Sequence, residues 1–198
     1  MDPAVASWRR QQRASLLAVR EALSLEERQR AASAVAEKLD ALIAPGGHAI
    51  IGLYWPIKHE IDLLHWASGL ARRPGIVLCL PVVVTPRAPL EYRRWTQGEP
   101  LERGAWDIPV PARRDVVMPD LMLAPLVGFD GDNYRLGYGG GYFDRTLAAL
   151  SRRPLVVGVG YAFSELTTIG PQPHDIPMDL VVTERRDMPA RKRRNHAT

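Results

Sequence analysis

Residues 125–145 have the sequence PLVGFDGDNYRLGYGGGYFDR, which joins the end of an apolar run to a glycine cluster and a new periodic segment. The apolar run 121–127 predicts a buried strand, and residues 142–150 predict a helix. A strand, a glycine loop and a helix start favour phosphate, because free backbone N–H groups and the helix N-terminus both attract anions. The stretch therefore predicts a phosphate or nucleotide loop in an α/β fold.

The glycine cluster at residues 137–141 differs from the two common phosphate motifs. It lacks the Gly-Lys-Ser/Thr ending of a Walker A loop, and its spacing departs from Gly-x-Gly-x-x-Gly. Two interpretations stay open from the residues alone: a phosphate loop, or a glycine-rich surface turn whose aromatic residues pack on the domain. In the first, Arg135 adds a bidentate charge contact, and Asp144, in the first helical turn, holds a magnesium ion that bridges phosphate oxygens.

The composition indicates one globular domain. A chain of 198 residues with 46% hydrophobic residues suits a single sizeable core. The single cysteine, Cys79, excludes an internal disulfide, and its apolar surroundings favour an inert buried thiol over a nucleophile. Residues 1–20 are too polar for a signal peptide, and no apolar run reaches the length of a membrane span. We expect a cytoplasmic protein.

The net charge is +4, and the basic residues are dense after Glu184. Such a run indicates either a nucleic-acid or membrane contact or a solvated tail. The segment has neither aromatic residues for base stacking nor an apolar face, so we favour a disordered tail at 186–198 after a single domain at 1–185.

Strands alternate with helices along the rest of the chain, which predicts a largely parallel sheet. The second helix begins with a capping box, Ser24 with Glu27 three residues later. Residues 97–114 look irregular, and we assign them to the wall of a cleft. The predicted helices are 4–22, 24–42, 63–73 and 142–150, and the predicted strands are 49–53, 76–80, 90–95, 121–127, 155–161 and 180–183.

The segments Gly128-Phe129-Asp130 and RLGYGGGYFDR at 135–145 resemble the signature of the 5-formyltetrahydrofolate cyclo-ligases, also called methenyltetrahydrofolate synthetases. The resemblance spans residues 9–183 and implies the three-layer α/β/α sandwich of that family. It implies a cyclising carbon–nitrogen ligase that uses ATP, with Mg²⁺, to convert 5-formyltetrahydrofolate to 5,10-methenyltetrahydrofolate, ADP and phosphate. The basic excess suits polyanionic substrates such as ATP and a polyglutamylated folate. We expect a monomer without nucleic-acid or membrane partners.

The resemblance also implies nucleotide-binding residues. Arg9 and Arg13 match a Lys-x-x-x-Arg pair on the family's first helix, with arginine in place of lysine. Without the resemblance, a solvated helix face stays open as the alternative, more so for Arg9 than for Arg13. Arg135 and Tyr142 are the implied catalytic residues. The implied ATP-binding residues are Arg9, Arg13, Arg135, Leu136, Gly137, Tyr138, Gly139, Gly140, Gly141, Tyr142 and Phe143.

Residues 54–62 are similar to the family pattern Tyr-x-Pro-x-x-x-Glu-x-Asp, which maps its folate contacts onto Trp55 and Glu60. A carboxylate suits the hydrogen-bond donors of a pterin edge. Taken alone, Glu60 would more often be a surface residue and Trp55 a core residue. The implied substrate-binding residues are Trp55, Glu60, Tyr138, Gly139, Gly140, Gly141 and Tyr142, with Tyr142 as a wall for the pterin ring.

The implied magnesium ligands are Asp144 and Asp175, the second within a His-Asp-x-x-x-Asp stretch at 174–179. The five histidines show no zinc-ligand spacing. Asn133 stands where the family has glycine, and asparagine tolerates the left-handed backbone that such a turn needs.

Two other function classes stay open. A related ATP-dependent enzyme would keep the phosphate loop and act on another small molecule, since a fold does not fix chemistry. A nucleic-acid-binding protein would use the basic tail, and its binding would weaken steeply with salt.

Overall fold

The computed structural model describes residues 2–43, 49–185 and 187–189. Its main sheet has the strand order β12-β11-β9-β6-β1-β2-β3. Neighbouring strands from β11 to β2 are parallel, and the edge strands β3 and β12 are antiparallel. The largely parallel sheet is therefore confirmed. Its strands are β1 (Ile50–Gly52), β2 (Val77–Val82), β3 (Glu91–Arg94), β6 (Leu121–Pro125), β9 (Leu155–Val159), β11 (Leu180–Val182) and β12 (Asp187–Pro189).

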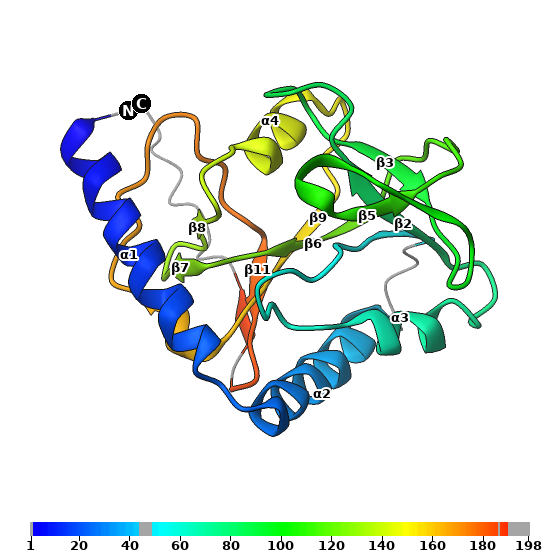
Figure 1. The fold of residues 1–198 in the computed structure, drawn as a ribbon, viewed down its shortest axis with the longest axis horizontal. Helices are drawn as coiled ribbons and strands as arrows, with labels where there is room; N and C mark the ends of the chain where they lie inside the picture. Colours follow the sequence, from blue (N-terminus) through cyan, green and yellow to red (C-terminus); the bar gives the residue numbers. More distant parts are fainter. Residues whose placement is uncertain (1, 44–48, 186, 190–198) are drawn as a thin grey trace, which may run out of the picture.

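Helices cover both faces of this sheet, which confirms the three-layer sandwich (Figure 1). The helices α2 (Leu25–Ile43) and α3 (Leu64–Leu70) cover one face, where Val35 and Leu39 share a core cluster with Leu121 and Leu123. The helix α4 (Tyr142–Ala149) covers the other face, where Phe143 belongs to a second cluster built on Met122 and Val156.

The helix α1 (Pro3–Glu21) lies outside these layers, beside a small sheet of β10 (Glu165–Leu166), β7 (Gly128–Asp130) and β8 (Arg135–Leu136) (Figure 1). The helix begins after Asp2, whose carboxylate accepts a hydrogen bond from the Ala4 N–H at 2.8 Å. Its buried residues are Arg9, Leu16 and Arg20. Their spacing places them on one face of the helix, so two charged side chains enter the protein beside an apolar one.

The capping box of α2 is confirmed. The Ser24 hydroxyl accepts a hydrogen bond from the Glu27 N–H at 3.2 Å, and the Glu27 carboxylate accepts one from the Ser24 N–H at 2.8 Å. Two N–H groups at the helix start thus gain partners.

Several short elements differ from the predictions. Residues 97–114 contain a hairpin of β4 (Leu101–Arg103) and β5 (Pro109–Pro111) around the 3₁₀ turn η1 (Ala105–Asp107). The predicted strand 121–127 ends early, and the expected loop after residue 164 contains β10, preceded by η2 (Ala162–Ser164). Residues 187–189 of the predicted tail form β12, while 186 and 190–198 lie outside the described residues. Strands of two or three residues carry too little periodicity to be predicted, and their partner strands hold them.

The core interpretation of Cys79 is confirmed, because its side chain is 0% exposed and burial raises the pKa of its thiol. In the described part of the chain, no helix is long and apolar enough to cross a membrane.

The strand order fixes where a ligand can bind. From β1 the chain continues to β2 on one side, whereas β6, β9 and β11 follow one another on the other side. The crevice at the carboxyl ends of β1 and β6 is therefore a topological switch point, where α/β folds bind their ligands.

Candidate active site

The glycine loop between β8 and α4 lies at this switch point. Gly139 and Gly141 have φ values of +97° and +65°, a region that favours glycine. A Cβ on Gly137 would lie 2.7 Å from an Arg135 guanidinium nitrogen, so this glycine makes room for the arginine. The preceding turn also holds, because Asn133 adopts the expected left-handed backbone with φ +62°.

The loop presents free hydrogen-bond donors. The backbone N–H groups of residues 138–143 bond to no group in the described part of the chain. The first N–H groups of a helix have no partner within it, and α4 has no side-chain cap. This backbone is suited to an anion, as the phosphate-loop interpretation requires.

Arg135 lies next to these donors. Its guanidinium is 4.8 Å from the centre of the Phe143 ring, and its side chain is 13% exposed. Its hydrogen bonds to the Pro125 carbonyl and the Asp144 carboxylate are both long, at 3.4 Å. The Arg135 guanidinium thus packs on the Phe143 ring and makes only long hydrogen bonds. An incoming phosphate can therefore replace these bonds with shorter ones.

Two further arginines flank the loop. The Arg13 Nε donates to the Gly137 carbonyl at 2.6 Å, and its guanidinium carbon is 3.6 Å from the position of a Cβ on Gly139. Arg145, absent from the predicted site, donates to the Gly140 carbonyl at 2.6 Å. Burial and the neighbouring Arg9 lower the pKa of Arg13, which indicates a crowded positive environment.

Arg9 has a different setting from the one predicted. Its side chain is 3% exposed, and it donates to the carbonyls of Ile169 and Gly170 and to both carboxylate oxygens of Asp175. These contacts occupy four of the five N–H donors of the guanidinium. The geometry thus favours a role in holding the loop 169–175, with the neighbouring Arg13 nearer to the phosphate loop.

The two predicted magnesium ligands lie near one another but are engaged differently. Asp144 accepts the N–H of Ile176, next to Asp175, at 3.1 Å. Burial opposes ionisation of Asp175, but the hydrogen bond and charge of Arg9 outweigh it and lower the pKa of that carboxyl. Asp144 has the carboxylate oxygen that is easier to free for a metal, because its Oδ2 accepts only the 3.4 Å hydrogen bond from Arg135.

The protein supplies few ligands for Mg²⁺. No group of three or more His, Cys, Asp or Glu side chains within the described ranges can hold a metal ion. Mg²⁺ at nucleotide sites needs only one or two carboxylates, because phosphate oxygens and water complete its shell. The residues fit magnesium in that shared form, with Asp144 as the better placed ligand.

Glu60 lies across the crevice, on the loop after β1. Lys58 and His59 before it have φ values of +47° and +57°, an uncommon backbone for residues other than glycine. The Tyr54 and Tyr161 hydroxyls donate to loop carbonyls at Ile61 and His59. Strained backbone held by surrounding contacts is typical of functional sites.

The Glu60 carboxylate is buried, with 6% of the residue exposed, which excludes the surface interpretation. One oxygen accepts the Ile57 N–H at 3.0 Å, and the other has no hydrogen bond of ordinary geometry, although the Tyr138 hydroxyl is close enough to act on it. Burial raises the pKa of Glu60 to about 7, against the Ile57 N–H and the charge of Arg20, which lower it. A buried oxygen without a partner is the feature expected of a group that awaits a ligand.

Tyr138 and Tyr142 point to different parts of the site. The Tyr138 hydroxyl lies beside Glu60, and Lys58 lies over its ring at 5.4 Å. The Tyr142 hydroxyl instead accepts the Arg87 N–H, and its ring meets Trp106 edge-on at 5.5 Å. Tyr138 is thus the tyrosine that joins the glycine loop to Glu60, whereas the sequence favoured Tyr142 as the wall beside the folate.

Trp55 packs toward the core. Its ring meets Trp95 edge-on at 6.5 Å, and it lies against the α2-side core cluster, half-buried. This position agrees with the core interpretation of Trp55.

Arg20 was missing from the predicted site. It is 1% exposed and donates to the Tyr138 hydroxyl at 3.2 Å and to the Leu126 carbonyl at 2.5 Å. The sequence held one signal for it, because positions 9, 13, 16 and 20 form one stripe at helical spacing.

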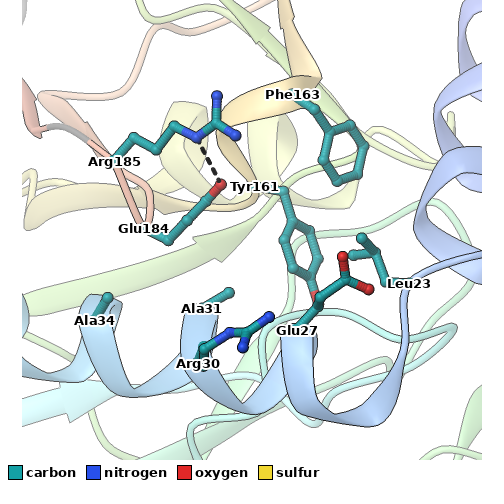
Figure 2. Close-up of a pocket in the computed structure, with 9 residues that line it drawn as sticks. All are labelled: Leu23, Glu27, Arg30, Ala31, Ala34, Tyr161, Phe163, Glu184 and Arg185. Atoms are coloured by element: carbon teal, nitrogen blue, oxygen red, sulfur yellow. Dashed lines mark ion pairs between the residues drawn. The ribbon is translucent and has the colours of Figure 1, made fainter.

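A cavity of about 400 Å³ lies elsewhere, between α2 and the chain after β9 and β11 (Figure 2). The rings of Tyr161 and Phe163 stack at 5.3 Å on one side of it. At its rim Glu27 is bound by its own helix cap, and Glu184 accepts a backbone N–H. None of its lining residues belongs to the glycine loop, and we assign no ligand to it.

A glycine loop with free donors, three arginines beside it and a buried carboxylate nearby meet at the switch point of a parallel sheet. Together they fit an α/β enzyme with a loop suited to phosphate and a second, polar subsite. The family model described as the 5-formyltetrahydrofolate cyclo-ligase family matches residues 5–184. The chain belongs to this family.

Relatives and solved structures agree. The 5-formyltetrahydrofolate cyclo-ligase of Mycoplasma pneumoniae is 30% identical over 87% of this chain and 96% of the relative. The 5-formyltetrahydrofolate cyclo-ligase of Haemophilus influenzae is 27% identical over 88% of this chain and 97% of the relative. The 5,10-methenyltetrahydrofolate synthetase structure from Aquifex aeolicus superposes with a TM-score of 0.79 at 30% identity, over 96% of this chain and 99% of the other. The 5,10-methenyltetrahydrofolate synthetase structure from Mycoplasma pneumoniae superposes with a TM-score of 0.74 at 28% identity, over 93% of this chain and 99% of the other.

Proposed function

We propose that this protein converts 5-formyltetrahydrofolate to 5,10-methenyltetrahydrofolate at the expense of ATP, with release of ADP and phosphate. The observation that carries the proposal is that Tyr138, within the glycine loop and its free N–H donors, lies next to the buried Glu60 carboxylate. The loop suits the triphosphate, and the buried carboxylate suits the N–H donors of the pterin edge.

The chemistry has two steps. The formyl oxygen attacks the γ-phosphorus of ATP, ADP leaves, and a phosphorylated imidate forms. The anilino nitrogen then attacks the activated carbon, its proton passes to solvent, and the oxygen departs as phosphate. The protein's task in such a reaction is positioning and charge stabilisation.

Each residue of the site has a part in this scheme. Arg135, with the N–H groups of residues 138–143, binds the phosphates and stabilises the charge on the transferring group. Arg13 holds the loop through the Gly137 carbonyl and adds positive charge. Glu60 binds and orients the pterin, and Tyr138 separates the two ligands.

Magnesium would be held by Asp144 with help from Asp175. When bound, it offsets negative charge on the phosphate oxygens. The other part of the proposal is a monomeric cytoplasmic enzyme that binds neither nucleic acid nor membranes. Its net charge of +4 supports the pairing with ATP and a polyglutamylated folate.

Changing Asp144 to Asn should lower kcat by at least about 10²-fold, because one carboxylate near the phosphates is lost. Added magnesium should restore part of the rate, since a weakened site fills at higher metal concentration. Steady-state rates across a magnesium titration measure this, with Asp115→Asn at the β3 edge as the control. Unchanged rates and unchanged magnesium dependence in Asp144→Asn would remove Asp144 from the site.

The direct test of the function mixes purified protein with 5-formyltetrahydrofolate, ATP and magnesium and follows the near-ultraviolet band of the methenyl product. We expect an increase that depends strictly on ATP. No product, with ATP binding still detectable by calorimetry, would assign the phosphate loop to an enzyme with a different substrate.

A further inference from the structure

Arg20 is a buried charge whose donors are only partly used. Within the described part of the chain its Nε has no hydrogen-bond partner, while Nη1 donates to the Tyr138 hydroxyl and Nη2 to the Leu126 carbonyl. Its guanidinium also lies 5.8 Å from the centre of the Tyr161 ring. A buried guanidinium is costly unless an anion is near, so neutral partners alone do not account for it.

The anion near Arg20 is Glu60. Both residues are buried, each keeps one polar atom without a hydrogen bond, and the Tyr138 hydroxyl is close to both. The charge of Arg20 acts on Glu60 although the two form no direct ion pair. A buried donor and a buried acceptor that each lack a partner suit a ligand that offers an acceptor and a donor in return.

We propose that Arg20 is a positioning residue for the folate, which fixes the Tyr138 hydroxyl beside Glu60 and places a positive charge near that acid. The pterin edge would then meet an ionised acceptor and a ring in a fixed position. This inference rests on the proposed function for the identity of the ligand, but the Arg20–Glu60 relation belongs to the free protein.

Several other groups also interact electrostatically with Glu60. Arg20 approaches from α1, Arg135 from β8, and Tyr138 from the glycine loop. Tyr54 and Tyr161 interact with it from the ends of β1 and β9. Of these groups, Arg20 and Arg135 carry the positive charges that lower the pKa of Glu60, and Arg20 is the larger of the two.

Replacing Arg20 by Met should therefore leave Glu60 protonated at neutral pH. Burial already raises the pKa of Glu60 to about 7, and loss of the Arg20 charge would raise it further. In a plot of the folate KM against pH, we expect the midpoint that reports Glu60 ionisation to move to higher pH by about one unit or more. The KM at pH 7 should rise about 10-fold, while the KM for ATP stays within about twofold. Above pH 9 the two proteins should converge.

The matched variants are Arg20→Lys, which keeps the charge, and Arg10→Met, which removes an exposed arginine from the same helix. Lysine should restore most of the pH profile, and Arg10→Met should resemble the wild type. If Arg20→Met raises the KM equally at every pH, Arg20 is merely structural and the inference fails. If Arg20→Met does not fold, Arg20→Lys provides the test. Because lysine keeps the charge, its pH profile of the folate KM should stay close to that of the wild type, with a similar Tm, and a folded Arg20→Lys with a clearly shifted profile would contradict the inference.

A second readout separates this inference from the proposed function. The carboxyl carbon of Glu60 can be titrated by NMR without substrate in wild type, Arg20→Met and Arg10→Met. An upward shift of the Glu60 midpoint in Arg20→Met alone supports the inference even if no folate turnover is found. A midpoint that stays in place overturns it even in an active enzyme.

Discussion

Replacing Arg135 by Met should lower kcat/KM for the overall reaction by about 10²- to 10³-fold, with most of the loss in kcat. The guanidinium lies over the Phe143 ring and next to Asp144, both in the first turn of α4, where the proposed reaction develops charge on the transferring phosphoryl group. Because its present hydrogen bonds are long, it gives up little to bind phosphate. Methionine keeps the packing on Phe143, so the fold is expected to survive.

Steady-state kinetics with ATP and folate varied separately measure this effect, with circular dichroism to check folding. Arg135→Lys keeps the charge but loses the planar fork, so an intermediate loss is expected. The exposed Arg152, changed to Met, is the control. Activity of Arg135→Met within twofold of wild type would remove Arg135 from the phosphate site.

Changing Glu60 to Gln raises the KM for folate by about 10²-fold, because charge-assisted hydrogen bonds to the pterin donors become neutral ones. The affinity for ATP should change little, since the glycine loop keeps its own donors. Calorimetry with folate and with ATP measures the two affinities separately. Equal losses of both would indicate a disturbed fold rather than a missing contact.

The same variant should change how stability depends on pH. Burial raises the pKa of Glu60 from 4.5 to about 7, so between these values the folded protein keeps a proton that the unfolded chain releases. The free energy of unfolding of the wild type therefore falls with rising pH in this window, by up to ~3 kcal/mol from this group. Glutamine cannot release that proton.

Urea denaturation at several pH values from 4.5 to 8 measures this difference. The stability of Glu60→Gln relative to wild type should grow with pH up to about 7 and then level off. Asp175 has a lowered pKa, so the stability that it contributes is lost only as the pH falls to more acidic values. This contribution is the same in the wild type and in Glu60→Gln, so it cancels in the difference. A constant difference across the range would show that Glu60 titrates normally.

The sheet, the capping box and the glycine loop could be predicted because each has a local cause. Apolar runs mark the strands, Ser24 and Glu27 lie three residues apart, and glycines mark the backbone that only they adopt readily. The buried oxygen of Glu60 was not visible, since a sequence does not show which surfaces close over a loop.

The partners of the arginines could not be predicted for a related reason. Arg9 and Arg13 are one turn apart on α1, yet one pairs with Asp175 and the other reaches the Gly137 carbonyl. Which loop faces each turn depends on the docking of α1 against the small sheet, and helical spacing gives only the shared face. The hairpin with Trp106 was missed because its strands are only three residues long.

Tyr138 has a consequence for how the two substrates bind. Its backbone belongs to the glycine loop proposed to bind the nucleotide, and its hydroxyl lies next to Glu60, the acid proposed to bind the folate. Any nucleotide that shifts this backbone also changes the environment of Glu60. Thermodynamic linkage then requires that folate change the affinity for the nucleotide by the same factor. Discrimination between nucleotides should therefore differ between the ternary and the binary complex, because both ligands act on the same tyrosine.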